Sequence, residues 1–338
     1  MLRHQKKKLK KNWTKTNFEA IADPFIYEGI LYTATNGSFY AINPETGDFI
    51  WEYKIPGKAT LPIFNNNYII FGGYYIDCTL YALDKNTGKE IWTCRLGPNS
   101  ASVLAEPICL NNLIYVFTGK TIYSISLENG KKTNSFKLKK KGARINIIIE
   151  DNKLYATTRN QLGKEEIECI DLQANELLWQ IKTPNIGSNL IYCNQHLYYL
   201  NTNTELCEIN PITGEMNSSK IVEVKNRVTN LHLCYNGTAL YLCIGYHIIA
   251  FNITTSPWSL LWNFHSNATI GKMVVTKEVV YFATMGNGFF GLNTTTGKEL
   301  FHENSEVRTK FSCAISPNKI IVAGSMSELE LTAYSEKE

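Results

Sequence analysis

The chain has 338 residues, of which 44% are hydrophobic, 12% aromatic and 19% charged. This composition excludes a disordered chain, a coiled coil and a collagen-like fibre. The formal net charge is +4, but residues 1–11 hold six Lys and Arg and no acid, which leaves 28 basic against 30 acidic residues elsewhere. We therefore expect a globular protein without the basic surface of a dedicated nucleic-acid binder, and no nucleic-acid partner.

The N-terminal segment is basic, and we expect residues 1–9 to form a flexible tail. This segment lacks the apolar stretch and the small-residue cleavage site of a secretory signal. The longest aliphatic run, residues 145–149, is far shorter than the roughly 18 apolar residues that a membrane-spanning helix requires. The nine cysteines form no C-x-x-C motif, which is typical of buried thiols in a reducing compartment. These features predict a cytoplasmic protein without a membrane span.

Self-similarity runs along the whole chain. The clearest copies hold a β-rich run, then Asn or Asp, then a polar turn ending in Thr-Gly, then a second run; they are residues 31–51, 79–92, 206–216 and 289–301. The residue just before the pair Ile/Leu–Asn/Asp serves as a marker of the copies, at intervals of 39–45 residues: Ala41, Ala82, Ser124, Cys169, Glu208, Ala250, Gly291 and Thr332. Such a period with four short strands per copy is typical of a β-propeller. We therefore predict an all-β fold, an eight-bladed β-propeller of four-stranded blades.

The predicted elements follow this repeat in chain order. Residues 10–16 resemble an outer strand and are expected to pair with the last blade, completing the eighth blade and closing the ring. In the second copy the predicted strands, from innermost to outermost, are residues 61–64, 68–73, 79–84 and 89–94. Four residues after the turn glycine, an aromatic residue is expected to pack between blades: Trp51, Trp92, Trp179 and Phe301, with Trp262 slightly displaced. Residues 10–338 are thus predicted to be a single domain.

The motif YALDKNTGKEIW, residues 81–92, resembles the repeat of PQQ-like, or quinoprotein-type, eight-bladed propellers. The resemblance covers essentially residues 10–338. That family includes exported quinone-dependent alcohol dehydrogenases, an outer-membrane assembly lipoprotein and many propellers without catalysis, so the motif marks the blade and not the activity.

The resemblance implies features of the dehydrogenases that this chain does not show. Those enzymes carry two adjacent cysteines over the quinone, and no two cysteines are adjacent here. They also use a calcium or lanthanide site built from carboxylates and an amide, and the loops show no obvious acidic cluster. The six histidines lack metal-ligand spacing. We therefore expect no cofactor, no metal and no enzymatic activity, a protein of the non-enzymatic branch.

Basic residues recur just before the predicted inner strands, in equivalent positions of four copies: Lys58, Arg144, Arg227 and Arg308. If they converge on one mouth of the central channel, this rim binds an anion or an acidic protein surface, because Arg suits carboxylate and phosphate geometry. Four independent surface charges, each paired with a nearby acid, are the equally favoured alternative.

Two loops between second and third strands are longer than the repeat demands. They contribute the candidate partner-binding residues Tyr74, Tyr75 and Asp77 in one loop and Arg159, Asn160, Gln161 and Lys164 in the other. Extra loop length on one face of a repeat protein often marks a binding surface, and neutral insertion is the alternative.

The sequence therefore favours a monomeric, non-catalytic cytosolic scaffold that binds another protein. A bacterial immunity or inhibitor protein that caps a toxin or effector is the specific candidate, by family analogy. The alternatives are a degenerate quinoprotein-type enzyme and an anion or nucleic-acid binder at the Arg-lined channel mouth.

Overall fold

The computed structural model describes residues 9–18, 23–65, 67–98, 102–103, 105–119, 121–138, 146–159, 165–220, 230–255, 257–286, 288–303, 313–316, 321–325 and 330–336. Every secondary-structure element of these residues is a β-strand, so the predicted all-β class is confirmed. No helix in this part of the chain is long and apolar enough to cross a membrane. The chain divides into two compact units: the first has Met1–Leu31, Pro44–Gly47 and Pro184–Glu338, and the second has Tyr32–Asn43 and Asp48–Thr183.

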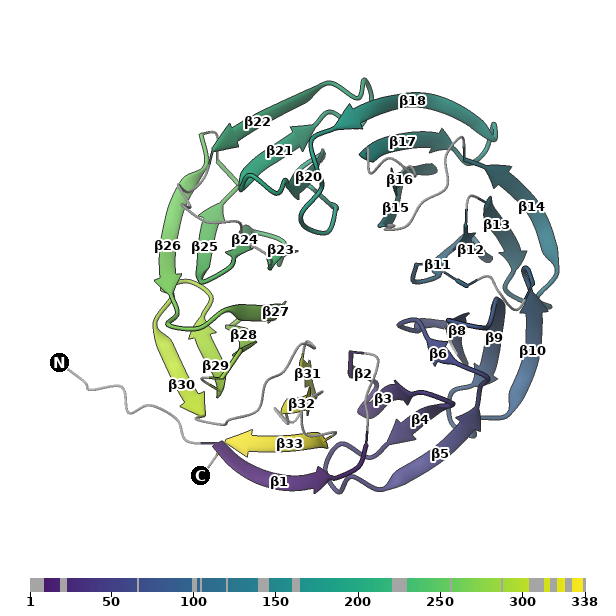
Figure 1. Ribbon diagram of the computed structural model, residues 1–338, viewed down its shortest axis with the longest axis horizontal. Coiled ribbons are helices and arrows are strands. Elements are labelled where there is room, and N and C mark those ends of the chain that lie inside the picture. Colours follow the sequence, from purple (N-terminus) through teal and green to yellow (C-terminus); the bar gives the residue numbers. More distant parts are fainter. Residues whose placement is uncertain are drawn as a thin grey trace. The chain divides into compact units, whose positions relative to one another are not determined.

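The strands form antiparallel sheets, mostly from consecutive stretches of chain (Figure 1). One sheet has the order β2 (Phe25–Tyr27), β3 (Ile30–Thr35), β4 (Ser38–Ile42), β5 (Phe49–Lys54). In the second unit, β6 (Lys58–Ala59), β7 (Ile63–Asn65), β8 (Tyr68–Tyr74), β9 (Thr79–Asp84) and β10 (Glu90–Arg95) share one sheet. The next is β11 (Ile108–Leu110), β12 (Leu113–Thr118), β13 (Thr121–Ser126), β14 (Lys132–Lys137), followed by β15 (Ile147–Glu150), β16 (Lys153–Arg159), β17 (Glu165–Asp171), β18 (Glu176–Thr183).

The sheets of the first unit continue the pattern. They are β19 (Ile191–Cys193), β20 (His196–Leu200), β21 (Glu205–Ile209), β22 (Met216–Lys220); then β23 (Leu231–Tyr235), β24 (Ala239–Ile244), β25 (His247–Asn252), β26 (Ser259–His265); then β27 (Ile270–Val275), β28 (Val279–Thr284), β29 (Gly288–Asn293), β30 (Glu299–Glu303). The last sheet combines β31 (Cys313–Ile315), β32 (Ile321–Ser325) and β33 (Glu330–Glu336) with β1 (Leu9–Lys15).

The prediction of eight four-stranded blades is wrong. Within the described residues the propeller has seven four-stranded blades, and the remaining sheet has five strands. The fifth strand arises because the long β8 pairs with two short strands, β6 through Ala59 and Gly73, and β7 through Ile63 and Ile70. Pro62 lies between β6 and β7, and a proline has no N–H to donate to a strand ladder, so the inner strand is interrupted there.

The predicted pairing of the N-terminal strand with the last one is confirmed. Strand β1 pairs antiparallel with β33 from Leu9 opposite Glu336 to Lys15 opposite Leu331. Figure 1 shows the two strands side by side. The observed strand begins at Leu9 and ends at Lys15, one residue earlier at each end than predicted.

The repeated tryptophans join neighbouring sheets, as the sequence predicts. The indole N–H of Trp51 donates to the carbonyl of Lys85 at 2.9 Å, and that of Trp92 donates to the carbonyl of Leu127 at 3.0 Å. The same bond links Trp13 to Pro44 at 2.8 Å and Trp262 to Thr294 at 2.7 Å. Each ring thus satisfies its polar atom, and the rings of Trp51, Trp92 and Trp262 are buried while Trp13 is partly buried.

The turn glycines make this packing close. Gly130 has a φ of 67°, and a Cβ built on it would lie 2.6 Å from the ring of Trp92. Two separate reasons therefore require glycine at this position: its backbone conformation is one that L-residues rarely adopt, and the ring of Trp92 occupies the space of a Cβ. Opposite each aromatic residue in register stands a small residue, as in the pairs of Ala41 with Trp51 and Ala82 with Trp92.

Candidate functional site

One blade interface of the first unit lacks this arrangement. In the sheet of β19 to β22, Asn217 stands opposite Glu208 in register, where the neighbouring sheet pairs Trp262 with Ala250. Both the aromatic residue and the small residue of the repeat are thus replaced by polar side chains. We call the boundary between the sheets β19–β22 and β23–β26 the Glu208 interface.

Strand register builds one wall of this interface. Tyr198 on β20 stands opposite Glu208 on β21, which stands opposite Asn217 on β22, so the three side chains lie in a row on one face of the sheet. The hydroxyl of Tyr198 donates to Oε1 of Glu208 at 2.7 Å. Burial of the ring, with this bond to a carboxylate, raises the pKa of Tyr198 above its ordinary value. The tyrosine therefore remains a neutral donor that holds Glu208 in place.

The other wall comes from the β25–β26 turn. This turn reads NITTSPW over residues 252–258 and carries no Thr-Gly. Its Trp258 packs on Tyr198 with ring centroids 5.2 Å apart. In sheets that keep the repeat, the equivalent tyrosine packs on the tryptophan of its own outer strand, as Tyr241 does with Trp262 at 5.9 Å. An aromatic residue of the next sheet thus replaces the missing tryptophan.

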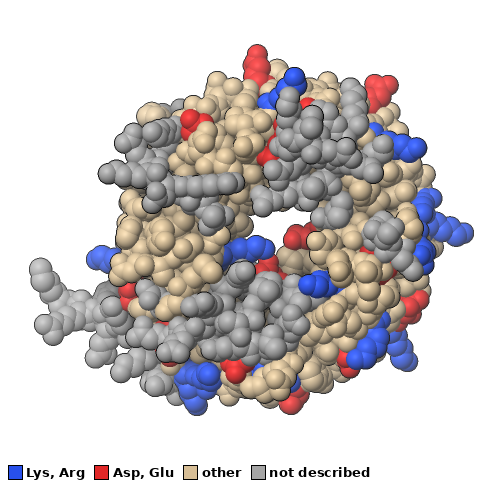
Figure 2. Space-filling view, in the orientation of Figure 1, with Lys and Arg blue, Asp and Glu red and all other residues tan. Residues whose placement is uncertain are grey.

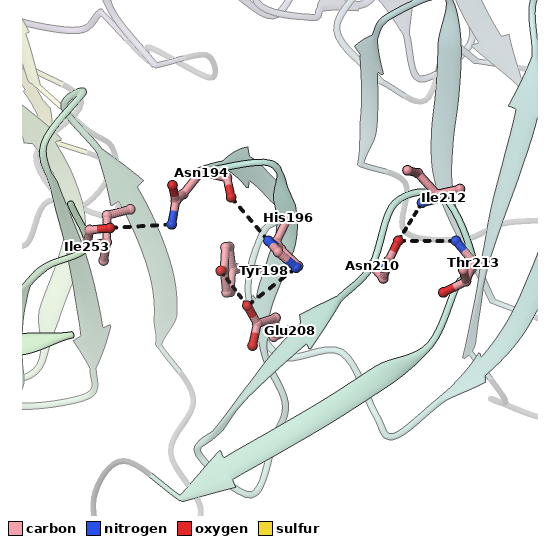
Figure 3. A network of polar contacts seen from close by, with 8 residues as sticks. All are labelled: Asn194, His196, Tyr198, Glu208, Asn210, Ile212, Thr213 and Ile253. Atoms are coloured by element: carbon pink, nitrogen blue, oxygen red, sulfur yellow. Dashed lines mark hydrogen bonds and ion pairs between the residues drawn. The ribbon is translucent and has the colours of Figure 1, made fainter. Parts of the chain in front are cut away.

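A backbone carbonyl that accepts from an indole at other interfaces accepts from a different side chain here (Figure 3). Ile253 occupies the turn position whose carbonyl accepts from an indole elsewhere, and here it accepts from Nδ2 of Asn194 at 3.4 Å. The carbonyl of Asn194 lies 3.1 Å from Nδ1 of His196, whose Nε2 lies 3.9 Å from Oε1 of Glu208. A polar network therefore runs along the edge of the interface in place of one indole.

A cavity of about 370 Å³ remains between the two walls. Its lining combines one carboxylate, small polar side chains and aromatic rings: Tyr198, Leu206, Glu208, Asn217, Ser218, Ser219, Phe251, Pro257 and Trp258. The Glu208 side chain is 41% exposed, so its charge is accessible from this cavity. The arrangement suits binding of a small polar or cationic group.

The structure brings together the first group of residues predicted from the sequence. Lys58 on β6 stands opposite Tyr74 at the end of β8, next to the loop that carries Tyr75. Tyr74 is 44% exposed, Tyr75 62% and Ile76 55%. Asp77 is instead buried, and its Oδ2 accepts a 2.7 Å hydrogen bond from the hydroxyl of Tyr81. This bond anchors the end of the loop to β9. We call residues Tyr74–Asp77 the Tyr75 loop.

The Tyr75 loop has an unusual backbone. Tyr75 and Ile76 both have a φ of 60°, a region that bulky and β-branched residues rarely adopt. The amide of Tyr75 donates to the hydroxyl of Ser102 at 3.0 Å, and a Cβ on Gly57 would lie 2.2 Å from the carbonyl oxygen of Tyr75. Strained backbone persists only where its surroundings hold it, and it concentrates at functional sites.

The second predicted loop and most of the predicted basic rim lie outside the described residues, namely Arg144, Asn160, Gln161, Lys164, Arg227 and Arg308. Arg159 ends β16, and its side chain is also outside them. Of the rim, the structure therefore places Lys58 alone. On the face drawn in Figure 2, the described Lys and Arg side chains are interspersed with Asp and Glu.

Sequence reasoning did not single out the Glu208 interface. Two signals for it are nevertheless present in the repeat. Glu208 is the one carboxylate among the marker residues, and the copy at 206–216 is followed by Asn217 and Ser218 where most copies carry an aromatic residue.

Comparison with known proteins gives the family. The family described as outer membrane protein assembly factor BamB matches residues 6–220. The chain belongs to this family. Its PQQ-like repeats agree with the resemblance found in the sequence, and membership of a branch without catalysis is not part of this match.

Solved structures similar to this BamB-family chain have the same fold. BamB from Moraxella catarrhalis aligns with a TM-score of 0.69 and 15% identity over 97% of this chain and 100% of that one. Quinohemoprotein alcohol dehydrogenase ADHIIG from Pseudomonas putida HK5 aligns with a TM-score of 0.72 and 12% identity over 99% of this chain and 77% of that one. At such identities the likeness concerns the propeller fold alone.

A curated relative corrects one expectation from the sequence. The dehydrogenase subunit of a quinone alcohol dehydrogenase from Acetobacter aceti is 34% identical over 100 residues, which are 26% of this chain and 13% of that protein. The expectation that this BamB-family chain is not an enzyme is therefore contradicted, because its relatives are named as enzymes. The match spans a small part of the relative's length.

A quinone and its metal ion, as the dehydrogenases hold them, need a cluster of metal-ligating side chains and two adjacent cysteines. Among them, no three His, Cys, Asp or Glu side chains gather as a metal ion requires. No two of the nine cysteines are adjacent in the sequence. The described residues thus do not fit a quinone with its metal ion.

Proposed function

We propose that this BamB-family propeller binds another protein through the Tyr75 loop and the adjoining Lys58. The observation that carries the proposal is the exposure of three consecutive large side chains, Tyr74, Tyr75 and Ile76, of which the last two have a backbone held at positive φ. Tyrosine is among the residues that contribute most to protein–protein affinity, because it combines a large apolar area with a hydroxyl.

The rigidity of the loop supports the proposal. The hydrogen bond to Ser102, the close approach of Gly57 and the buried Asp77–Tyr81 pair each hold the loop in one conformation. A loop that is already ordered loses little conformational entropy on binding, so more of its buried apolar area contributes to affinity.

The family description also supports binding to another protein, without naming the partner of this chain. Its description names an assembly factor for outer membrane proteins. The more specific hypothesis, that the partner is a toxin or effector that this chain caps, comes from the sequence, and the experiment below tests it through the identity of the partner.

The experiment combines capture with crosslinking. A photo-crosslinking residue replaces Tyr75 in one variant and Tyr246, which is 48% exposed on the other unit, in the matched control. We expect a stoichiometric protein partner that crosslinks at position 75 and not at position 246. The double variant Tyr75→Ala and Ile76→Ala should weaken its binding at least about tenfold.

Two outcomes would contradict the proposal. One is equal binding of the partner by the double variant and by Tyr246→Ala, and the other is recovery of the native protein without any partner. A captured partner that is toxic when expressed alone would support the immunity hypothesis, and a harmless one would exclude it.

A further inference from the structure

The cavity at the Glu208 interface is the feature of the described residues that protein binding by the Tyr75 loop does not use. It lies wholly within the first unit, whereas the Tyr75 loop belongs to the second. At this interface Asn217 takes the place of the repeated aromatic residue, and Glu208 takes the place of the small residue opposite it.

The charge of the cavity is negative. Among the residues that line the cavity, Glu208 has the one carboxylate, and none has an amine or a guanidinium group. Tyr198 is neutral. The hydroxyl of Tyr198 and the ring of His196 both approach Oε1 of Glu208. No hydrogen bond or ion pair to Oε2 is found among the described residues. These contacts hold the carboxylate in place through Oε1, and Oε2 is left available to an incoming donor.

The apolar part of the lining suits a cation as well. Trp258 packs on Tyr198 at 5.2 Å and on Phe251 at 6.5 Å between ring centroids, so three rings line the cavity together with the carboxylate. Aromatic rings attract ammonium groups through their quadrupole, and tryptophan does so most strongly. The hydroxyl groups of Ser218 and Ser219 and the amide of Asn217 add neutral acceptors.

We propose that this cavity binds an alkylammonium group, with Glu208 as the ion-pair partner, Trp258 and Phe251 around the alkyl chain, and Asn217 as a further acceptor. A lysine side chain of a bound peptide and a free diamine present the same chemistry. A neutral sugar would use the same aromatic and polar groups, but it would not need the charge of Glu208.

The test uses the full chain and calorimetric titration with 1,5-diaminopentane, with Nα-acetyl-lysine methylamide and with maltose. We expect both amines to bind and maltose not to bind. Glu208→Gln keeps the size of the side chain and removes its charge, so it should weaken amine binding at least about tenfold. Trp258→Leu should weaken it about three- to tenfold.

Glu215→Gln is the matched control, because Glu215 is an exposed carboxylate in the turn between β21 and β22, outside the cavity. It should bind both amines like the native protein. Tighter binding of the lysine derivative identifies a peptide as the source of the group, and tighter binding of the diamine identifies a free amine. Equal amine affinity of Glu208→Gln and Glu215→Gln overturns the proposal, as does binding of maltose without either amine.

Discussion

The interface at Trp92 and the interface at Glu208 join neighbouring sheets by different means. At the first, one ring fills the space between sheets, covers Gly130 and bonds to the carbonyl of Leu127. At the second, a carboxylate, an amide and a tryptophan from the opposite turn share that task and leave a cavity. The repeat therefore provides cohesion, and a departure from the repeat provides a place for a ligand.

The two interfaces also differ in how deeply their tryptophan is buried, and so in how much each ring contributes to the free energy of unfolding. Trp92 lies in a core with Ile70, Leu80, Val116 and other apolar residues that are almost fully buried. Trp258 is partly exposed and borders the cavity. Stabilisation by apolar burial scales with the area removed from water, so the two tryptophans should contribute unequally.

The largest effect is expected at the Trp92 interface. Trp92→Ala removes a buried ring and leaves a cavity against a glycine turn that cannot fill it, so the free energy of unfolding should fall by about 3–5 kcal/mol. Urea unfolding measures this loss. Trp92→Phe keeps most of the apolar area and should recover more than half of it, and a loss under about 1 kcal/mol for Trp92→Ala would contradict the role of the ring.

A smaller effect is expected at the Glu208 interface. Trp258→Ala should lower the free energy of unfolding by about 1–2 kcal/mol, because the ring is only partly buried and already borders empty space. The same urea titration checks it. If Trp258→Ala were as costly as Trp92→Ala, the two interfaces would be energetically equivalent, and the comparison would be wrong.

The third effect concerns pH. Burial lowers the pKa of His232 on β23 to about 4, and the nearby Lys272 adds to this shift while Asp23 opposes it. The unfolded chain takes up this proton near pH 6.5, well before the folded one, so stability falls as the pH drops from about 6.5 towards 4. The loss should be about 1–2 kcal/mol at pH 5 relative to pH 7.

Unfolding of the native protein and of His232→Gln at both pH values isolates this contribution, since the variant should lose less stability on acidification. Equal losses would show that other groups cause the pH dependence. At the Trp92 interface, burial raises the pKa of Cys78 to about 11, so this thiol stays neutral throughout the same range.

The repeat itself could be read from the sequence because each part has a local cause. The turn glycines, the aromatic residues between blades and the pairing of the N-terminal strand with the last strand each follow from backbone geometry and period. The number of four-stranded blades was wrong because Pro62 interrupts an inner strand, and β8 is long enough to pair with both fragments. A sequence pattern indicates the interruption but not the extra pairing.

The candidate sites were predictable only in part. Loop length singled out Tyr74 and Tyr75, which are exposed, but it could not distinguish them from Asp77, whose burial depends on a hydrogen bond to Tyr81. The Glu208 interface depends on Trp258, which reaches Tyr198 from the neighbouring sheet. The position of Trp258 relative to its turn does not reveal which sheet it packs against, because the turn departs from the repeat.

The pairing of β1 with β33 sets an order of events during synthesis. Leu9 finds its partner Glu336 only after every other described strand has left the ribosome. Until then the first strand has unpaired backbone groups, and the last sheet lacks its outer strand. Contacts between residues so far apart in sequence form slowly, because closing a long loop is entropically costly. A nascent chain of this protein therefore carries an open strand edge throughout its translation, and chaperones that cover such edges would act on its first strand.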